Sequence, residues 1–317
     1  MTLSTSHLKS CASRLGFSAC GVAPAEPVDE FVAKRYCDWI TEGKQADMGY
    51  LNNHVEKRLD PTLLVEGAKS VISVALNYYP AEMLDDEWQY EFAWYAYGQD
   101  YHEIMKARLS ALAEALLEDV EGEVHYRLFC DTAPVLERYW AWRCGLGWIG
   151  KNTQLIIPHA GSAFFLGEII IDRPFTTYDE PVPSRCGTCT RCLKACPTQA
   201  LHHPYELDAH RCLSYLTIEF RGEKLPVEAT CAMGNCIYGC DRCQRSCPWM
   251  RFARPTEVQE FHPKAEFLGL NRSSLESLSI DDYRNIFRGS AIKRAKYEGL
   301  MRNVRAVMDI TPKSSVD

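Results

Sequence analysis

The stretch Cys186-Gly-Thr-Cys189-Thr-Arg-Cys192-Leu-Lys-Ala-Cys196-Pro197 has the C-x2-C-x2-C-x3-C-P spacing of a bacterial ferredoxin run. In such a run three thiolates bind one 4Fe-4S cluster, and the fourth binds a second cluster. The chain carries a matching second run, C-x2-C-x3-C-P, at Cys240-Asp-Arg-Cys243-Gln-Arg-Ser-Cys247-Pro248. The two runs therefore predict a ferredoxin-like region that holds two 4Fe-4S clusters.

The spacing alone leaves one ligand undecided. Two such clusters need eight thiolates, and the two runs supply seven. The eighth must be Cys212, Cys231 or Cys236. Zinc sites usually use two C-x2-C pairs, and disulfide frameworks belong to small secreted chains. Two runs that each end in Cys-Pro favour iron-sulfur clusters over both alternatives.

Composition limits the class of protein. With 317 residues and 46% hydrophobic content, the chain can bury a sizeable core in two domains or in one large domain with an insert. Residues 1–10 are polar and the longest apolar runs have the length of strands, so we expect a cytoplasmic protein with no membrane segment. Fifteen cysteines then indicate metal or redox chemistry. A net charge of -7 argues against bulk attraction to nucleic acid, but it allows a local basic patch.

The chain before the cysteine runs is predicted to mix helices and strands. Apolar residues recur at helical spacing after residue 101 and alternate with polar residues over 124–130. The predicted elements are helices at 8–15 and from 101 onward (apolar face Met105, Leu109, Leu112 and Leu116), and strands at 71–76, 124–130, 153–157 and 163–171. We expect the last two strands to pair through a turn at 159–162.

Asp131 follows the strand predicted at 124–130, and strand ends are where ligands bind in open sheets. The segment Asp131-Thr-Ala-Pro-Val-Leu-Glu137 is also compatible with a second interpretation, in which Asp131 only caps a helix. The nearby sequence Gly145-Leu-Gly147-Trp-Ile-Gly150 has the G-x-G-x-x-G spacing of a dinucleotide-binding motif. Because it follows a predicted helix rather than a strand, we exclude a nicotinamide site.

Several motifs, in this order along the chain, resemble those of the epoxyqueuosine reductases. They are Glu56-Lys57-Arg58-x-Asp60-Pro61, Asp131-Thr-Ala-Pro-Val-Leu-Glu137, Gly145-Leu-Gly-Trp-x-Gly-Lys151-Asn152, the first cysteine run, Arg211-Cys212-Leu-Ser214-Tyr-Leu-Thr217, and Gly234-Asn-x-Ile-Tyr-Gly-Cys240-Asp241-x-Cys-Gln. That family removes the epoxide oxygen of epoxyqueuosine at the anticodon wobble position of tRNA. It uses cobalamin and two 4Fe-4S clusters, in the last step of queuosine synthesis.

The resemblance implies a role for individual residues. It assigns Cys186, Cys189, Cys192 and Cys247 to one cluster, and Cys196, Cys212, Cys240 and Cys243 to the other. Asp131 matches the catalytic acid of the family. The implied cobalamin contacts are Arg58, Asp131, Leu155, Leu166, Ser214, Cys240 and Asp241. Cys231 and Cys236 then become spare thiols.

We therefore expect an α+β fold in three parts. Residues 1–178 would form a mixed α/β cobalamin and substrate domain, 179–250 the ferredoxin-like domain, and 251–317 a short, basic, helical tail. Some family members carry HEAT-type repeats after the clusters, and this chain ends at Asp317 without room for them. The basic residues of the tail are Arg284, Arg288, Lys293, Arg294, Lys296, Arg302 and Arg305.

Basic helices are usually solvated faces, but a tRNA substrate favours phosphate contacts here, with Arg288, Lys293, Arg294 and Lys296 as the predicted residues. We expect Asp131 to have a raised pKa through shielding by aromatic residues that include Trp140 and Trp148. We also expect a monomer that receives electrons from a flavodoxin or ferredoxin system. The alternatives are a corrinoid-dependent reductase of another substrate, such as a dehalogenase, and a dicluster protein that only transfers electrons.

Overall fold

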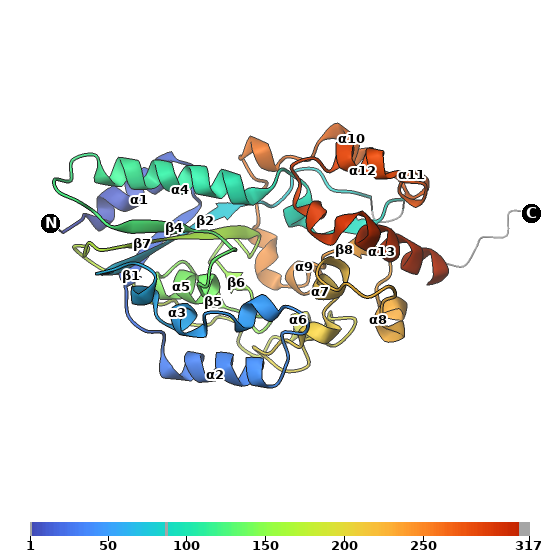
Figure 1. Cartoon of the computed structure of the whole chain (residues 1–317), viewed down its shortest axis with the longest axis horizontal. Helices are drawn as coiled ribbons and strands as arrows, with labels where there is room; N and C mark the ends of the chain where they lie inside the picture. Colours follow the sequence, from blue (N-terminus) through green and yellow to red (C-terminus); the bar gives the residue numbers. More distant parts are fainter. Residues whose placement is uncertain (1, 86–87, 311–317) are drawn as a thin grey trace, which may run out of the picture.

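A computed structural model describes residues 2–85 and 88–310 of the chain (Figure 1). The strands are β1 (Ala19–Pro24), β2 (Ser70–Asn77), β3 (Glu91–Phe92), β4 (Tyr126–Phe129), β5 (Trp148–Ile149), β6 (Leu155–Ile156), β7 (Phe164–Ile171) and β8 (Cys236–Tyr238). The helices before the cysteine runs are α1 (Thr5–Arg14), α2 (Glu30–Thr41), α3 (Val55–Leu59), α4 (Tyr101–Leu117) and α5 (Glu137–Arg143). The later ones are α6 (Arg191–Lys194), α7 (Leu213–Ile218), α8 (Val227–Ala232), α9 (Arg242–Arg245), α10 (Ala265–Leu268), α11 (Arg272–Glu276), α12 (Ile280–Ile286) and α13 (Lys296–Ile310).

The main sheet has the strand order β1-β2-β7-β4, and every neighbouring pair is antiparallel. The central strand β2 is buried along almost its whole length because helices cover the sheet on both faces. Figure 1 shows α1 and α4 above the sheet and α3 and α5 below it. The expected strand at 71–76 is thus confirmed as β2.

The apolar stripe of α4 forms the core on one face of this sheet. Asp100 caps the helix by accepting the backbone N–H of His102, and Met105 and Leu109 are fully buried against β7. Burying each such side chain stabilises the fold by roughly 1.5–3 kcal/mol. The predicted helical face is therefore confirmed, and it fixes the position of the first turn of α4 relative to the sheet.

The predicted strand pair at 153–157 and 163–171 is wrong. The strand β6 pairs with β5, while β7 pairs with β2 and β4. Only an isolated bridge joins Ile157 to Gly161 within the described residues. The close approach of β5 to β6 depends on Gly147, because a Cβ atom there would lie 2.2 Å from the carbonyl oxygen of Ile156. The glycine-rich motif therefore permits backbone packing.

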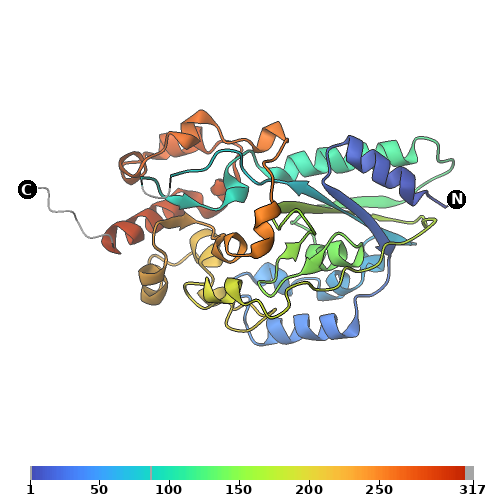
Figure 2. The ribbon, with the colours of Figure 1, turned by 180° about the vertical axis from the view of Figure 1, so that it is seen from behind.

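The segment between the two cysteine runs and the tail share one core with an earlier segment. Leu84 and residues from 90–97, 209–238 and 267–307 contribute to this core, which lies in one half of the molecule (Figure 2). Within it, β3 pairs in parallel with β8. The expected α+β fold with a helical tail is confirmed. The boundaries 1–178, 179–250 and 251–317 stay a prediction, and residues 311–317 of the tail lie outside the described residues.

The basic residues near the end of the chain do not lie on one continuous helix, as the sequence had suggested. They lie on α12, on a 3-10 turn (Ala291–Ala295, labelled η7 here) and on α13. The chain changes direction at Gly289 and at Lys296, both of which have positive φ angles. Among the helices of the described ranges, none is long and apolar enough to span a bilayer.

Candidate active site and cluster region

Asp131 lies on the loop between β4 and α5, at one end of the main sheet. β4 ends at Phe129, which pairs with Glu168 of the antiparallel strand β7. Asp131, two residues further on, therefore lies near Leu166 of β7. The backbone of Asp131 has a φ of 57°, in the left-handed region that aspartate tolerates better than most residues. The N-cap of α5 is Leu136, so the interpretation of Asp131 as a helix cap is wrong.

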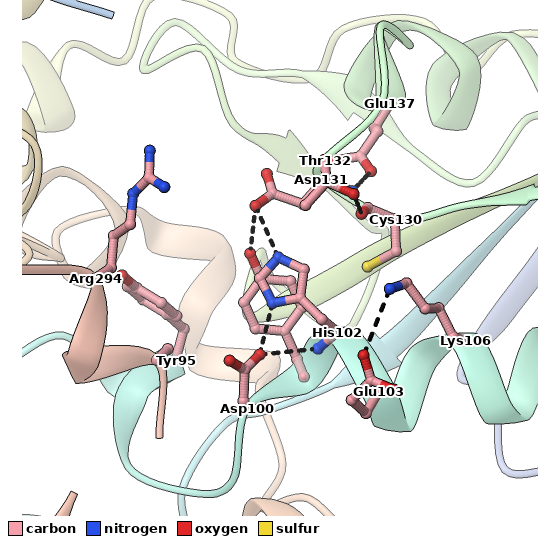
Figure 3. Close-up of polar contacts among 12 residues, drawn as sticks. Tyr95, Asp100, His102, Glu103, Lys106, Cys130, Asp131, Thr132, Glu137 and Arg294 are labelled. Carbon is pink, nitrogen blue, oxygen red and sulfur yellow. Dashed lines mark hydrogen bonds and ion pairs between the residues drawn. The ribbon is translucent and has the colours of Figure 1, made fainter. Parts of the chain in front are cut away.

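Two side chains from the first turn of α4 bind the carboxylate of Asp131 (Figure 3). The hydroxyl of Tyr101 donates to Oδ2 at 2.8 Å, and Nε2 of His102 lies 3.2 Å from the same oxygen. The other ring nitrogen of His102, Nδ1, lies 2.6 Å from Oδ1 of Asp100. An imidazole can donate to both acids only when it is protonated.

The two carboxylates set the protonation of this group. Hydrogen bonds to Asp100 and then to Asp131 raise the pKa of His102 to about 9. Conversely, the His102 hydrogen bond lowers the pKa of Asp131, and the Tyr101 hydrogen bond and the charges of His102 and Arg294 act in the same direction. At neutral pH the arrangement is therefore an imidazolium between two carboxylates.

The expectation of a raised pKa for Asp131 is wrong. Its side chain is 55% exposed and is hydrogen-bonded by two donors, which favours the charged form. Trp140 and Trp148 are buried in the core, where they pack against Tyr139 and Trp249 respectively. The rings that contact Asp131 are instead those of Tyr101 and His102.

A second acid, Glu137, binds the backbone of the loop that carries Asp131. Glu137, at the start of α5, accepts a hydrogen bond from the backbone N–H of Asp131. Burial, and then the charge of Asp131, raise the pKa of Glu137 to about 7. Burial also raises the pKa of Glu168 far above its ordinary value, and Ser73 donates to this acid at 3.1 Å. Of these three acids, Asp131 is therefore the one whose charged form is favoured and whose side chain is exposed.

The thiols that influence one another's pKa values form two sets. Burial raises the pKa of Cys247, and Cys186 and Cys189 add to this shift. Cys247 and Cys186 likewise raise the pKa of Cys192. Cys186, Cys189, Cys192 and Cys247 are therefore neighbours in space.

The second group is more deeply buried. Burial raises the pKa of Cys243, and the neighbouring thiols that add to the shift are Cys240, Cys212 and Cys196. Cys236 adjoins this group, because a hydrogen bond from its thiol lowers the pKa of Cys240. Cys236 is nevertheless fully buried, and its thiol also donates to the carbonyl of Gly239 at 2.7 Å. Within the described residues, no three side chains converge as the ligands of a single metal ion do. A cluster has a different requirement, because each thiolate binds its own iron at a separate corner.

The residues predicted to contact cobalamin lie on several elements. Leu155 on β6 and Leu166 on β7 pack in one apolar cluster, although they belong to different sheets. Arg58 on α3 is only 8% exposed, and its Nε atom has no hydrogen-bond partner in the described part of the chain. A buried guanidinium with an unused donor fits a ligand that carries amide or phosphate oxygens.

The other predicted contacts are close to the second cysteine run. Asp241 follows Cys240, is buried, and accepts the backbone N–H of Trp94 at 2.6 Å. Burial raises the pKa of Asp241 to about 7. Ser214 lies on the first turn of α7, two residues after Cys212. These contacts therefore lie beside the second thiol group.

The basic residues of the tail divide into two kinds. Arg288, Lys293, Arg294 and Lys296 are exposed. Arg294 extends from η7 toward the region of Asp131 (Figure 3). Arg302 was included in the basic stretch, but it is buried and donates to the carbonyls of Leu216, Phe220 and Gly222. Its role is structural, because α13 packs against α7.

Sequence reasoning missed three members of the site, namely Asp100, Tyr101 and His102. The available signal was Asp100-Tyr-His102 at the N-cap of a helix whose other face is entirely apolar. Nothing in the spacing indicates that this turn meets a loop some thirty residues later. That proximity results from the pairing of β4 with β7 and the packing of α4 on β7.

Comparisons with known proteins agree with this geometry. A family model described as "Epoxyqueuosine reductase QueG, DUF1730" matches residues 58–132, and one described as "4Fe-4S double cluster binding domain" matches residues 185–250. The chain is 45% identical over 297 residues to the epoxyqueuosine reductase of Cellulophaga algicola, and the match covers 94% of this chain and 95% of that protein.

Solved structures give the same result. The chain superposes with a TM-score of 0.87 and 29% identity on an epoxyqueuosine reductase with an epoxyqueuosine-modified tRNA stem loop, covering 96% of this chain and 80% of that one. A Bacillus subtilis epoxyqueuosine reductase, whose catalytic loop with an aspartate is swung out of the active site, matches with a TM-score of 0.85 and 28% identity over 96% of this chain and 80% of that one. The chain therefore belongs to the epoxyqueuosine reductase family of oxidoreductases, and its residues 185–250 form a 4Fe-4S double cluster binding domain.

Proposed function

We propose that this chain reduces epoxyqueuosine to queuosine at the anticodon wobble position of tRNA. Electrons would pass from a flavodoxin or ferredoxin donor through two 4Fe-4S clusters to cobalamin, with Asp131 as the general acid and the chain acting as a monomer. The observation that carries the proposal is the carboxylate of Asp131 at an open sheet end, hydrogen-bonded to a protonated His102. The relative bound to a modified tRNA stem loop supports the choice of substrate.

The overall reaction consumes two electrons and two protons, because an epoxide becomes an alkene and its oxygen leaves as water. Cobalamin, when bound, supplies a strongly reducing centre that can deliver the electrons to the epoxide. Arg58 would bind oxygens of the corrinoid, and Leu155 and Leu166 would pack against its apolar face. Ser214, Cys240 and Asp241 would contact it beside the cluster held by Cys196, Cys212, Cys240 and Cys243.

Asp131 and His102 would deliver a proton to the departing oxygen. Asp131 is charged at rest, so the proton is stored on His102, whose pKa is about 9. As negative charge develops on the epoxide oxygen, Asp131 can take the proton from Nε2 of His102 and pass it to that oxygen. The hydroxyl of Tyr101 holds the carboxylate in place during this transfer. Asp100 keeps the imidazole oriented and protonated.

The basic residues Arg288, Lys293, Arg294 and Lys296 would bind phosphates of the anticodon arm. All four are exposed, and the charge of Arg294 acts on Asp131, whose pKa it helps to lower. A local positive surface of this kind can hold tRNA on a chain whose net charge is -7.

Anaerobic reconstitution tests the function directly. Purified protein is supplied with iron, sulfide and cobalamin, and its absorption spectrum is recorded before reduced donor and epoxyqueuosine-containing tRNA are added. We expect broad iron-sulfur absorption, a corrinoid that remains with the protein after gel filtration, and queuosine in the digested tRNA. A protein that holds both clusters but retains no corrinoid and forms no queuosine would be an electron carrier or a different reductase.

A further inference from the structure

Tyr50 presents an exposed aromatic ring that the proposed reaction leaves without a role. It lies on a 3-10 turn (Gly49–Asn52, labelled η1 here), and the residue is 47% exposed. The guanidinium carbon of Arg294 lies 5.8 Å from the centroid of its ring. Residues from distant parts of the chain therefore build a flat, cationic and aromatic surface.

A third residue fixes this pair. Nε and Nη2 of Arg294 donate to the two carboxylate oxygens of Glu219 at 2.7 and 2.9 Å. Such a bidentate contact holds the guanidinium plane in one orientation. A hydrogen bond also links Arg294 to the side chain of Tyr50. The Arg294 side chain is 56% exposed, so its guanidinium can donate to an incoming oxygen.

The pair is electrostatically linked to the candidate acid. The charge of Arg294 contributes to the lowered pKa of Asp131, while burial, followed by the charges of Glu219 and Asp131, raises the pKa of Tyr50. Figure 3 shows Arg294 and Asp131 extending from η7 and from the β4–α5 loop toward the same region. Tyr50, Arg294 and Asp131 are thus close enough to interact electrostatically.

We propose that Tyr50 is a stacking surface for a nucleobase adjacent to the wobble nucleoside, with Arg294 binding the phosphate between the two. This inference rests on the proposed function, since it requires a tRNA substrate. An epoxide cannot reach Asp131 while its nucleoside stays stacked in the anticodon loop, and proteins hold such splayed bases on aromatic rings and arginine planes. The exposed ring and the exposed guanidinium of Arg294 offer both contacts side by side.

The test measures binding to an anticodon stem loop that carries epoxyqueuosine and a 2-aminopurine next to it. We expect Tyr50→Ala to weaken binding roughly 5- to 150-fold, from the 1–3 kcal/mol contributed by one stacked base. The quenching of 2-aminopurine fluorescence on binding should decrease in the same variant. Tyr50→Phe keeps the ring and should retain both properties.

A matched control exists on α2. Arg35 lies 5.6 Å from the centroid of the exposed ring of Phe31, so Phe31→Ala removes a similar pair on another part of the surface. Unchanged affinity and quenching in Tyr50→Ala, when the unaltered protein binds and converts the stem loop, would overturn the stacking role alone. A failure of the unaltered protein to convert the stem loop would instead reject the proposed function. Iron content and thermal unfolding establish that each variant is folded.

Discussion

Nε2 of His102 lies 3.2 Å from Oδ2 of Asp131, and this pairing joins the first turn of α4 to the end of β4. The pKa of Asp131 is lowered, so this carboxylate is unprotonated at rest, and the proton that it must deliver is held by His102. A carboxylate that stays charged between turnovers can also face solvent without a desolvation cost. Proton delivery then depends on two residues rather than on one.

Asp131→Asn separates acid catalysis from structure. Asparagine keeps the size and tolerates the left-handed backbone, but it has no proton to transfer. We expect the variant to fold, bind corrinoid and tRNA, and convert epoxyqueuosine at least roughly a hundredfold more slowly, at the low end of the range for general acids. Single-turnover kinetics with pre-reduced protein provides the measurement. Near-normal turnover would mean that water or another side chain protonates the oxygen.

His102 predicts a pH dependence. Its pKa is raised from 6.5 to about 9, so the imidazolium is lost as the pH rises through about 9, and turnover should fall there. Because this pKa is raised in the folded state, the interaction of protonated His102 with its two carboxylates stabilises the fold fully below about pH 6.5. The stabilisation is lost as the pH rises through about 9. In His102→Gln, the alkaline limb of the rate profile should vanish, and the difference in unfolding free energy from the unaltered protein should shrink over that interval. An identical alkaline limb in both proteins would contradict the role of His102.

The assignment of the eighth ligand is tested by two cysteine variants. Cys212 lies beside both Cys240 and Cys196, whereas the thiol of Cys236 contacts Cys240 and donates to the carbonyl of Gly239. Cys212→Ser should therefore lower the iron content toward that of one cluster, and Cys236→Ser should leave both clusters filled. Iron analysis and electron paramagnetic resonance of reduced samples measure this, with the exposed Cys231→Ser as the control. The reverse outcome would exchange the roles of Cys212 and Cys236.

The exposed basic residues predict a salt effect. Changing Lys293, Arg294 and Lys296 together to Ala should weaken tRNA binding and reduce the slope of log K against log salt by roughly 0.7–0.9 for each lost phosphate contact. Both clusters should remain intact. The double variant of Lys34 and Arg35 on α2 is the control for general loss of positive charge. An unchanged slope in the triple variant would make these residues a solvated face.

Arg302 and Arg305 should behave differently although both lie on α13. Arg302 is buried on backbone carbonyls, so Arg302→Ala leaves buried acceptors without donors and should cost about 1–3 kcal/mol of unfolding free energy, or more. The exposed Arg305→Ala should stay within about 0.5 kcal/mol. Denaturant titration distinguishes the two. In neither variant do we expect the salt dependence of tRNA binding to change beyond the loss of one surface charge.

The amino-acid sequence by itself determined the features that depend on local spacing. The intervals between cysteines predict the cluster region, and the repeat of Met105, Leu109, Leu112 and Leu116 predicts the apolar face of α4, because both patterns follow from the geometry of a turn or a helix. The same reasoning places Asp131 at the end of a strand. These predictions involve only residues close together in the chain.

Only the tertiary structure decided which distant segments meet. It pairs β6 with β5 instead of β7, because Gly147 allows two backbones to approach. It also brings His102 to Asp131, lowering the pKa that the sequence had suggested would be raised. The same is true of Arg302, whose charge is visible in the sequence but whose burial depends on the packing of α13 against α7. A side chain's protonation and exposure are set by neighbours that are far away in sequence, and local patterns carry no information about them.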